Sequence, residues 1–388
     1  MQRLETAGVP YADPWLQPLD ERLRMLARGK RRVAYYYESA NNSTFRYRAY
    51  NMVQVLGADD EGHVGASYFF HADREHFGEI AAQADVLVIC RSGYDDTVAA
   101  LLAHFRARHR PVIFDIDDFV FDTEYAHLIM NTLAVPTHDS AAWPHWFHYL
   151  GSMGATLRQC DAGITTNEFL ARRMAAFSGK PVAVVPNFMN REQLALSDQV
   201  FEEKQRRRFE GDGSIVLGYF SGSPSHTHDF AIVEPALAAL LATDERLRVM
   251  VVGYIDAGPQ LAQFGERIIR EPFHDYVNLQ RLVGTVDFSL APLQRNVFTD
   301  CKSPLKVFEA SAAGTLSIAS PSWNYADVVQ DGENGYLARA HEWERKIRHA
   351  IDHLPRYGAM AERARDEAVQ RFAWQGQRAA IERALGWG

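Results

Sequence analysis

Short, continuous apolar runs that alternate with amphipathic stretches constrain the fold of this chain more than any other feature. Each run has the length of a strand, and the stretches between runs have the period of helices. Apolar strands joined by helices are typical of a parallel sheet that is covered on both faces, which is the core of a doubly wound α/β domain. The predicted strands are 33–37, 85–90, 111–116, 162–166, 182–185, 215–220, 247–252, 267–269, 286–290 and 315–319.

The pattern is interrupted once, and the interruption divides the chain into two domains. A Pro186-Asn187 pair follows a strand, and the polar, charged residues 197–213 are predicted to form a linker and a surface helix. The length of 388 residues allows two to three domains of roughly 150 residues. We predict a first domain over residues 1–188 and a second over 189–371. A ligand is expected between them, at the carboxyl ends of both sheets.

The composition excludes several classes of protein. The formal net charge is −8, and an acidic chain is a poor general nucleic-acid binder because phosphates require a basic face. Cys90, Cys160 and Cys301 are far apart and have neither zinc spacing nor the pattern of a disulfide framework. The chain lacks an apolar run of about 20 residues and a signal-peptide pattern, so we expect a soluble cytoplasmic protein.

Residues 301–314 contain the densest group of chemically useful side chains. Ser303 suits the N-cap of a helix, Pro304 suits its first position, and Gly314 suits its end. The free N–H groups and the dipole of such a helix favour an anion at its N-terminus.

Two lysines and a glutamate belong to this helix. Lys302 and Lys306 are placed to reach the same anion, and Glu309 lies about one turn beyond Lys306. This set suits a nucleoside diphosphate, with the phosphates on the lysines and amides and the ribose hydroxyls on the carboxylate. The spacing fits an ordinary capped surface helix with a Lys–Glu pair equally well.

Residues 302–314 (KSPLKVFEASAAG), the apolar strand after them and residues 325–337 (YADVVQDGENGYL) resemble the donor-binding half of glycosyltransferase family 4. The Pro-Asn pair and residues 251–253 are similar to other motifs of that family. The resemblance implies the GT-B fold, in which two Rossmann-like domains face each other across a cleft. Residues 369–374 resemble the segment that crosses back, which implies a C-terminal helix at about 372–388 packed onto the first domain.

The family carries a Glu-x7-Glu pair, and the match to it is incomplete. Glu309 matches the second glutamate, which implies that it binds the ribose. Cys301 stands at the position of the first glutamate, so the sequence leaves open how the hydroxyls of the transferred sugar are held.

A loop of small residues follows the first strand of the second domain. Small residues let a backbone approach a ligand closely, and successive N–H groups bind phosphate oxygens. The family has an Arg/Lys pair in this loop, whereas this chain has His226 and His228 before a helix that opens at Asp229. A plain strand–helix turn is the alternative, and no metal is expected because a third ligand is missing. The predicted donor contacts here are Ser221, Gly222, Ser223 and His226.

The strand 111–116 of the first domain ends in three carboxylates, which face the ligand if the sheet is parallel. Asp117 or Asp118 is predicted to orient or deprotonate an acceptor hydroxyl. A structural cluster is an alternative reading. Another is the haloacid-dehalogenase nucleophile motif, which the strand and the Asp-x-Asp of Asp115 and Asp117 resemble, although Phe119 stands where that motif has Thr or Val.

A polar loop and two arginines follow the first strand. In the family this loop lies beside the donor phosphates and the acceptor, which implies roles for Ser43, Thr44, Arg46 and Arg48. The two arginines cannot point the same way on a helix, so one of them is expected to face the ligand.

Two further segments have an open interpretation. Residues 138–149 (HDSAAWPHWFHY) are aromatic and suit either a sugar-stacking platform or the packing of an insertion. Residues 22–32 hold six basic side chains, which suit either a solvated helix face or peripheral contact with an anionic membrane that carries a lipid-linked acceptor.

The sequence therefore predicts an enzyme that moves a sugar, expected to be a hexose, from a nucleotide-diphosphate sugar to a hydroxyl of a glycan or lipid-linked acceptor. The setting expected from the resemblance is bacterial polysaccharide assembly, with retention of configuration. Asp117, Asp118 and Lys306 are the predicted catalytic residues, with no metal and no cofactor besides the donor. A phosphohydrolase that uses Asp115 and Asp117, and a non-catalytic nucleotide- or glycan-binding protein, are the alternatives.

Overall fold

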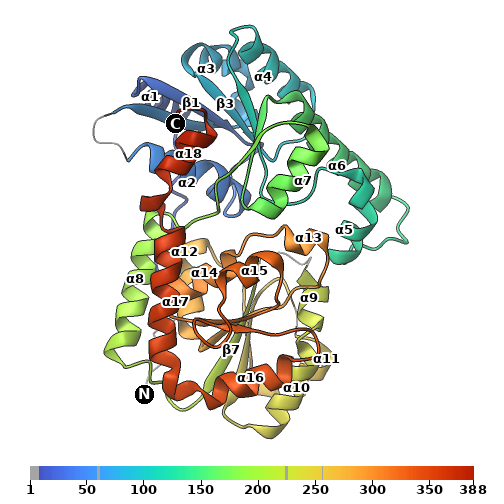
Figure 1. Ribbon diagram of the computed structural model, residues 1–388, viewed down its shortest axis with the longest axis vertical. Coiled ribbons are helices and arrows are strands. Elements are labelled where there is room, and N and C mark those ends of the chain that lie inside the picture. Colours follow the sequence, from blue (N-terminus) through green and yellow to red (C-terminus); the bar gives the residue numbers. More distant parts are fainter. Residues whose placement is uncertain (1–7, 59–61, 223–225, 256) are drawn as a thin grey trace.

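The computed structural model describes residues 8–58, 62–222, 226–255 and 257–388 (Figure 1). It contains two α/β domains, each built around one six-stranded sheet. The strand pairs of both sheets are parallel.

The first domain has the strand order β2-β1-β3-β4-β5-β6. Its strands are β1 (Arg31–Tyr36), β2 (Val64–Phe69), β3 (Val86–Cys90), β4 (Val112–Asp115), β5 (Ala162–Thr165) and β6 (Val182–Val184). Its helices are α1 (Leu19–Ala27), α2 (Asn51–Leu56), α3 (Phe77–Gln83), α4 (Asp96–Arg106), α5 (Ala126–Thr132), α6 (Ala142–Gln159) and α7 (Glu168–Ser178). A π-helical turn over Arg46–Tyr50 leads into α2.

The second domain has the strand order β12-β11-β10-β7-β8-β9. Its strands are β7 (Ile215–Ser221), β8 (Leu247–Gly253), β9 (Ile268–Glu271), β10 (Phe288–Ala291), β11 (Leu316–Ala319) and β12 (Tyr336–Leu337). The helices from the connection onwards are α8 (Arg191–Arg206), α9 (Thr227–Ala231), α10 (Glu234–Thr243), α11 (Pro259–Ala262), α12 (Tyr276–Thr285), α13 (Val297–Asp300), α14 (Leu305–Ala312), α15 (Trp323–Val328), α16 (Trp343–Asp352), α17 (Tyr357–Phe372) and α18 (Arg378–Ala384).

The apolar runs are explained by burial of the sheets on both faces. On one face of the first sheet, Leu87 and Phe114 pack with Phe105 of α4. On the other face, Val88 packs with Val53 of α2. A strand that is covered on both sides needs apolar residues at every position, so its sequence does not alternate.

The predicted α/β class and its two doubly wound sheets are confirmed, and each predicted strand is present. The pattern of apolar runs does not predict two of the strands, β2 and β12. The strand β2 is fully buried but contains Gly65 and Ser67, so it has no apolar run. A Cβ at Gly65 would lie 2.0 Å from the Leu26 carbonyl oxygen, so the close approach of α1 requires glycine there. The strand β12 has only two residues.

The chain passes between the domains at two places that lie side by side. The Met189 N–H donates to the Phe372 carbonyl at 2.8 Å. After this crossing, α18 packs on the first domain, where Ile381 and Leu385 join the core around Val33. Figure 1 shows α17 running along the second domain and α18 against the first.

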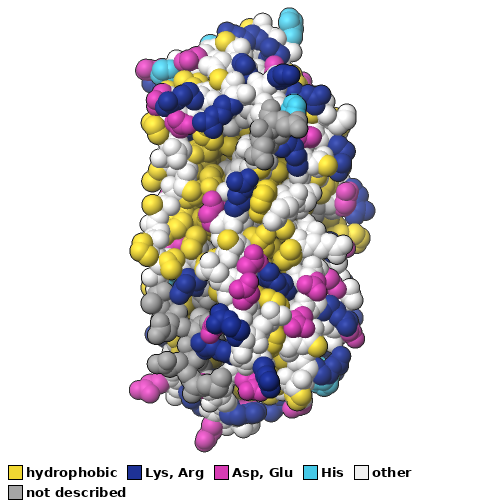
Figure 2. All heavy atoms as spheres, turned by 90° about the vertical axis from the view of Figure 1, so that its left-hand side faces the viewer, with side chains coloured by type: hydrophobic (Ala, Val, Ile, Leu, Met, Phe, Trp, Pro, Cys, Tyr) yellow, Lys and Arg dark blue, Asp and Glu magenta, His cyan; other side chains and the backbone are white. Residues whose placement is uncertain are grey.

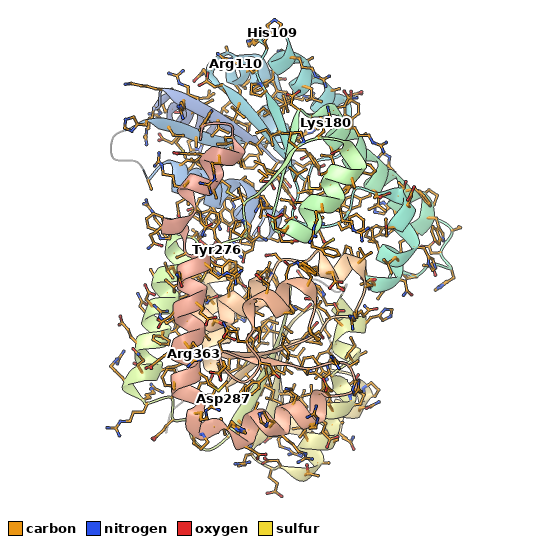
Figure 3. All side chains as sticks on the ribbon, viewed as in Figure 1. His109, Arg110, Lys180, Tyr276, Asp287 and Arg363 are labelled. Carbon is orange, nitrogen blue, oxygen red and sulfur yellow. The ribbon has the colours of Figure 1, made fainter. Side chains whose placement is uncertain are left out.

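Aromatic side chains also join the two domains near the N-terminal segment. Tyr276, at the start of α12, stacks on Trp15 with the ring centroids 6.1 Å apart and meets Tyr11 edge-on at 5.5 Å. The guanidinium of Arg46 lies 4.5 Å from the centre of the Tyr276 ring. Figure 3 shows Tyr276 at the level where the two domains meet.

Ion pairs occupy much of the basic segment 22–32. Arg22 is buried and binds Asp73 with both terminal nitrogens, at 2.6 and 2.9 Å. Arg24 pairs with Asp20 at 2.9 Å on the surface. Figure 2 shows basic and acidic side chains interspersed on one face of the molecule. Within the described ranges no helix combines the length and the apolar character that crossing a bilayer demands, and peripheral contact stays a prediction.

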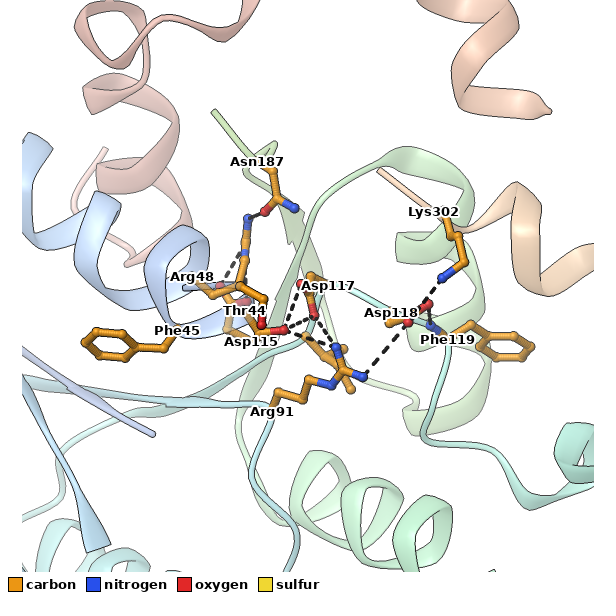
Figure 4. Close-up of polar contacts among 12 residues, drawn as sticks. Thr44, Phe45, Arg48, Arg91, Asp115, Asp117, Asp118, Phe119, Asn187 and Lys302 are labelled. Carbon is orange, nitrogen blue, oxygen red and sulfur yellow. Dashed lines mark hydrogen bonds and ion pairs between the residues drawn. The ribbon is translucent and has the colours of Figure 1, made fainter. Parts of the chain in front are cut away.

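A buried ion pair fixes the end of β4. Arg48 Nε and Nη2 donate to the two oxygens of Asp115 at 2.7 and 2.9 Å, and neither side chain is more than 1% exposed. Arg48 Nη1 donates to the Val185 carbonyl at 2.7 Å and to Asn187 Oδ1 at 3.1 Å (Figure 4). The pair therefore ties β4 to the segment that leaves the first domain. Arg48 is a structural residue, so the prediction that it contacts phosphate or acceptor is wrong.

Replacement of Arg48 by methionine is expected to lower the free energy of unfolding by about 3–5 kcal/mol, because Asp115 would stay buried without a countercharge. The double variant Arg48→Met, Asp115→Leu removes both charges and should lose less than Arg48→Met alone. Urea unfolding followed by circular dichroism measures both values. The control is Arg24→Met in the exposed pair with Asp20, which should cost at most about 1 kcal/mol. Equal losses for Arg48→Met and Arg24→Met would contradict the structural role.

Candidate active site

The N-terminal tip of α14 lies at the boundary between the domains. The helix begins at Leu305, with Pro304 as an N-cap residue that offers no side-chain hydrogen bond. The prediction that Ser303 caps the helix is therefore wrong, because the helix starts one residue later than expected. The Ser303 hydroxyl is buried and makes no hydrogen bond within the described part of the chain. Uncapped amides and an unpaired hydroxyl leave polar groups at this tip for a ligand.

The two predicted lysines flank this tip. Lys302 Nζ lies 3.5 Å from Asp118 Oδ2 in the first domain and 4.5 Å from the centre of the Phe298 ring. Lys306 Nζ lies 4.8 Å from the centre of the Tyr219 ring. Burial lowers the pKa of Lys306 to about 8, and the charge of Lys302 adds to this effect. An anion bound between the two ammonium groups would stabilise the charged form of both lysines.

Glu309 is held by groups from outside its own helix. The Tyr47 hydroxyl donates to Glu309 Oε1, Gln193 Nε2 donates to the same oxygen at 2.6 Å, and Arg46 Nη2 lies 3.6 Å from it. All three contacts use Oε1. Oε2 makes no hydrogen bond to the described residues and is the oxygen that a ribose would meet. Its binding to ribose stays a prediction.

Arg46 points into the protein rather than toward a phosphate site. Its side chain is 5% exposed, and Nη1 donates to Gln193 Oε1 at 3.0 Å. Because Arg46 also lies 3.6 Å from Glu309 Oε1, its predicted contact with a ligand stays a prediction. Both arginine side chains of the π-helical turn are buried, and they point to different partners, Arg46 to Gln193 and Arg48 to Asp115.

The small-residue loop after β7 lies beside Lys306. Ser221 ends β7 and is buried, Gly222 is exposed, and Ser223 lies outside the described residues. A Cβ at Gly253, which ends the neighbouring strand with φ +97°, would lie 1.9 Å from the Ser221 carbonyl oxygen. Glycine is therefore required there for the two strand ends to approach each other.

The two histidines of this loop have different partners. His226 Nδ1 lies 2.9 Å from Asp229 Oδ2, so it carries the proton and donates it to the carboxylate. Burial lowers the pKa of His226 to about 4, and Lys306 and Lys302 add to this, so the ring is neutral at pH 7. His228 Nδ1 lies 3.0 Å from the Asn131 carbonyl oxygen in the first domain, where it is placed to donate. The histidines do not converge on one point.

The first domain brings two carboxylates to the boundary. Asp117 accepts hydrogen bonds from Thr44 Oγ1 at 3.2 Å and Arg91 Nη1 at 3.1 Å. Asp118 lies 3.5 Å from Lys302 and 3.9 Å from Arg91 Nη2 (Figure 4). The structure thus places Thr44 beside Asp117, and Asp118 opposite the predicted donor lysine Lys302. Ser43 donates to Asn41 instead.

Arg91 is a residue of this site that the sequence patterns do not single out. It follows β3 with φ +36°, an uncommon value for a residue other than glycine. Its guanidinium contacts Asp117 and Asp118, and its Nε donates to the Tyr149 hydroxyl at 3.2 Å. The available signal was its place directly after an apolar strand of a parallel sheet, where ligand-site residues gather.

Cys301 does not replace the family's first glutamate as a ligand group. Its side chain is fully buried and belongs to the apolar cluster of the first domain, with Phe119 and Ile116. Its carbonyl oxygen accepts a hydrogen bond from Asn167 Nδ2 of the first domain at 2.8 Å. The thiol at this position packs the two domains together.

Comparison with known proteins gives a match to the second domain and to the fold. Residues 216–355 match the family described as glycosyl transferases group 1. No curated protein matches the chain in sequence. Anabaena HepE in complex with UDP is similar in structure, with a TM-score of 0.59, 15% identity, and 91% of this chain and 99% of that chain covered.

Two further solved structures show the same architecture. For a glycosyltransferase from Rickettsia africae the TM-score is 0.61 at 12% identity, covering 92% of this chain and 99% of that one. For WaaG, a glycosyltransferase involved in lipopolysaccharide biosynthesis, the TM-score is 0.56 at 14% identity, covering 91% and 100%. The chain therefore has the GT-B fold, and residues 216–355 of its second domain match the family described as glycosyl transferases group 1.

Proposed function

We propose that this protein transfers a sugar from a nucleotide-diphosphate sugar to a hydroxyl of an acceptor held by the first domain. One observation carries the proposal: Lys302 and Lys306 flank the uncapped tip of α14, with Glu309 one turn further on, opposite Asp118. The match to glycosyl transferases group 1 supports it. The Anabaena neighbour was crystallised with UDP and with UDP-glucose, which favours a uridine nucleotide as the first donor to test.

The proposed reaction is a glycosyl transfer in which negative charge develops on the leaving diphosphate. The bond between the anomeric carbon and the diphosphate oxygen breaks, and the acceptor oxygen forms a new bond to that carbon. Lys302, Lys306 and the amides of α14 stabilise the negative charge on the leaving diphosphate most strongly in the transition state, which is what lowers the barrier. Asp117 is the proposed orienting group for the acceptor hydroxyl, whose proton leaves to a carboxylate or to the diphosphate.

The finer features rest on the resemblance. We propose a retaining transfer of a hexose that uses no metal and no cofactor besides the donor, because the lysines and helix amides neutralise the diphosphate. The acceptor is a glycan or a lipid-linked glycan of bacterial polysaccharide assembly, reached from the cytoplasm. The likeness in fold to WaaG supports this setting.

The structure weakens the phosphohydrolase alternative. A nucleophilic Asp115 would need a free oxygen at the surface, but both of its oxygens bind Arg48 and the side chain is 1% exposed. Turnover of a sugar donor distinguishes the proposed enzyme from a non-catalytic nucleotide-binding protein. A thermal-shift screen of nucleoside diphosphates identifies the base, since a ligand that binds the folded state stabilises it. Release of the diphosphate from the matching sugar donor then tests catalysis.

Affinity for UDP is expected to fall as the pH rises through about 8. The pKa of Lys306 is lowered to about 8 by burial, and only the protonated ammonium attracts the diphosphate. Binding is therefore strongest below this pH and weakens above it, which calorimetry from about pH 7 to about pH 9 measures. Lys306→Arg stays charged over this range and should flatten the profile. The same fall in both proteins would exclude Lys306 as its cause.

Glu309→Gln is expected to weaken UDP binding about tenfold, because a hydrogen bond to a charged group contributes roughly 1.5–3 kcal/mol. The variant should also lose the preference for UDP over its 2′,3′-dideoxy analogue. Tyr47→Phe is the matched control, since it removes a contact to Oε1 and leaves Oε2 unchanged. A preserved preference in Glu309→Gln would remove this residue from the ribose site.

Asp117→Asn is expected to lower kcat by about 100-fold or more, the range of a lost acid–base group. UDP affinity should change by less than about twofold, because the carboxylate belongs to the first domain. Steady-state kinetics and calorimetry on the same preparation give both values. A larger loss in UDP affinity than in kcat would move Asp117 from the acceptor to the donor.

A further inference from the structure

A groove in the first domain is lined by residues that the proposed function does not use. The segment after β4, α6 and α7 enclose a volume of about 510 Å³, within the range of sites for small ligands. Its walls contain Phe119 and Phe121, which are buried, and Tyr125 and Phe177, which are half-buried. The volume of the groove is large enough for a sugar ring, and Tyr125 and Phe177 offer aromatic surface to it.

Two arginines of this groove have aromatic partners instead of carboxylates. The guanidinium of Arg158 lies 4.2 Å from the centre of the Phe177 ring. The guanidinium of Arg173 lies 5.5 Å from the centre of the Phe169 ring, and its Nη1 donates to the Tyr125 hydroxyl at 3.1 Å. Neither arginine forms an ion pair with a described residue. Their charge is therefore available to an anion, and their planar groups are held in place by the rings.

Two acidic residues also line the groove. Asp122 accepts a hydrogen bond from the Glu124 N–H at 3.0 Å, and both line the groove. The two carboxylates lie on the segment after β4, whereas the two guanidinium groups lie on α6 and α7. An anionic group of a ligand is thereby directed to the side of Arg158 and Arg173, and a uniformly charged polymer such as a nucleic acid is a poor fit.

The aromatic and basic groups continue from the groove to the active site. Phe169 meets Trp323 of the second domain with the ring centroids 5.5 Å apart, and Arg172 lies 5.3 Å from the centre of the Trp323 ring. Trp323 is 52% exposed. At the inner end, Phe119 directly follows Asp118, which faces Lys302. The groove and the carboxylates at the domain boundary thus belong to consecutive residues of the same segment.

We infer that the groove binds an acceptor whose sugar rings carry anionic groups, either carboxylates or phosphates. Sugar rings stack on Tyr125, Phe177 and Trp323, while the guanidinium groups of α6 and α7 donate to the anion as paired N–H groups. The role as acceptor rests on the proposed function. Binding of the anionic sugar does not, since it involves only the groove.

Binding of defined probes to the full chain tests the inference. The first pair is a glucuronate-containing tetrasaccharide and the same sugar with its carboxyl groups reduced to alcohols. The second pair is glucose 6-phosphate and glucose. Ligand-observed NMR and calorimetry should give at least fivefold tighter binding for the anionic member of one pair, which identifies carboxylate or phosphate as the preferred group. Equal affinity within both pairs would overturn the inference. So would the absence of binding of either anionic probe at a concentration of about 10 mM, at which even weak ligands bind.

Substitutions of the two groove arginines test whether the anionic probe binds in the groove. Arg158→Gln and Arg173→Gln should each weaken the anionic probe about fivefold or more and leave its neutral partner unchanged. Arg191→Gln is the matched control, because its guanidinium also lies over a ring, 4.5 Å from the centre of Trp374, but outside the groove. A loss in Arg191→Gln equal to that in the groove variants would overturn the assignment to the groove. Circular dichroism of each variant confirms folding.

UDP affinity, measured on the same proteins, separates this inference from the proposed function. Groove variants should bind UDP as the unaltered chain does. If the chain binds no nucleotide and turns over no donor, yet binds the anionic probe through Arg158 and Arg173, the proposed function fails and the groove stands. If donor turnover is present and charge on the probe makes no difference, the groove assignment fails alone.

Discussion

The rest of the site depends on the buried pair of Arg48 and Asp115. A bidentate ion pair without solvent is stable only if every donor and oxygen is satisfied, and here the remaining guanidinium nitrogen binds the Val185 carbonyl and Asn187. The pair therefore fixes three things at once: the end of β4, the π-helical turn before α2, and the exit of the chain toward the second domain. Asp117 and Asp118 follow two and three residues after Asp115, so their positions are set by this anchor.

The second domain supplies the complementary charge from a single short helix. Lys302 and Lys306 stand at its tip, and their charges are tolerated because one ammonium lies near Asp118 and both lie over aromatic rings. Partial burial has a second effect. It lowers the pKa of Lys306 to about 8, so near that pH part of the free protein holds a neutral lysine, and a bound diphosphate would favour its protonated form. Binding of an anion and protonation of this lysine are therefore coupled.

The fold was largely predictable because continuous apolar runs follow directly from burial on both faces of a sheet. The strand β2 was not, since Gly65 serves a close helix contact that has no local signature. In the site, Lys302, Lys306 and Asp117 were predictable because they flank a helix start or a strand end. The partners of Glu309 were not, because Tyr47 and Gln193 lie 262 and 116 residues away in the chain. Contacts over such separations depend on how the domains meet.

The thiol at the family's first glutamate position changes how the donor sugar can be held. An acid at Cys301 would be buried at the edge of the apolar cluster that also contains Phe119 and Ile116, and its charge would lose its hydration. The thiol avoids this cost and allows the domains to pack, with Asn167 on the Cys301 carbonyl. Asp118, a carboxylate of the first domain, lies beside this tip and pairs with Lys302. Under the proposed function, a donor sugar held between these two groups would contact both domains at once, so the packing of the domains would be part of donor recognition.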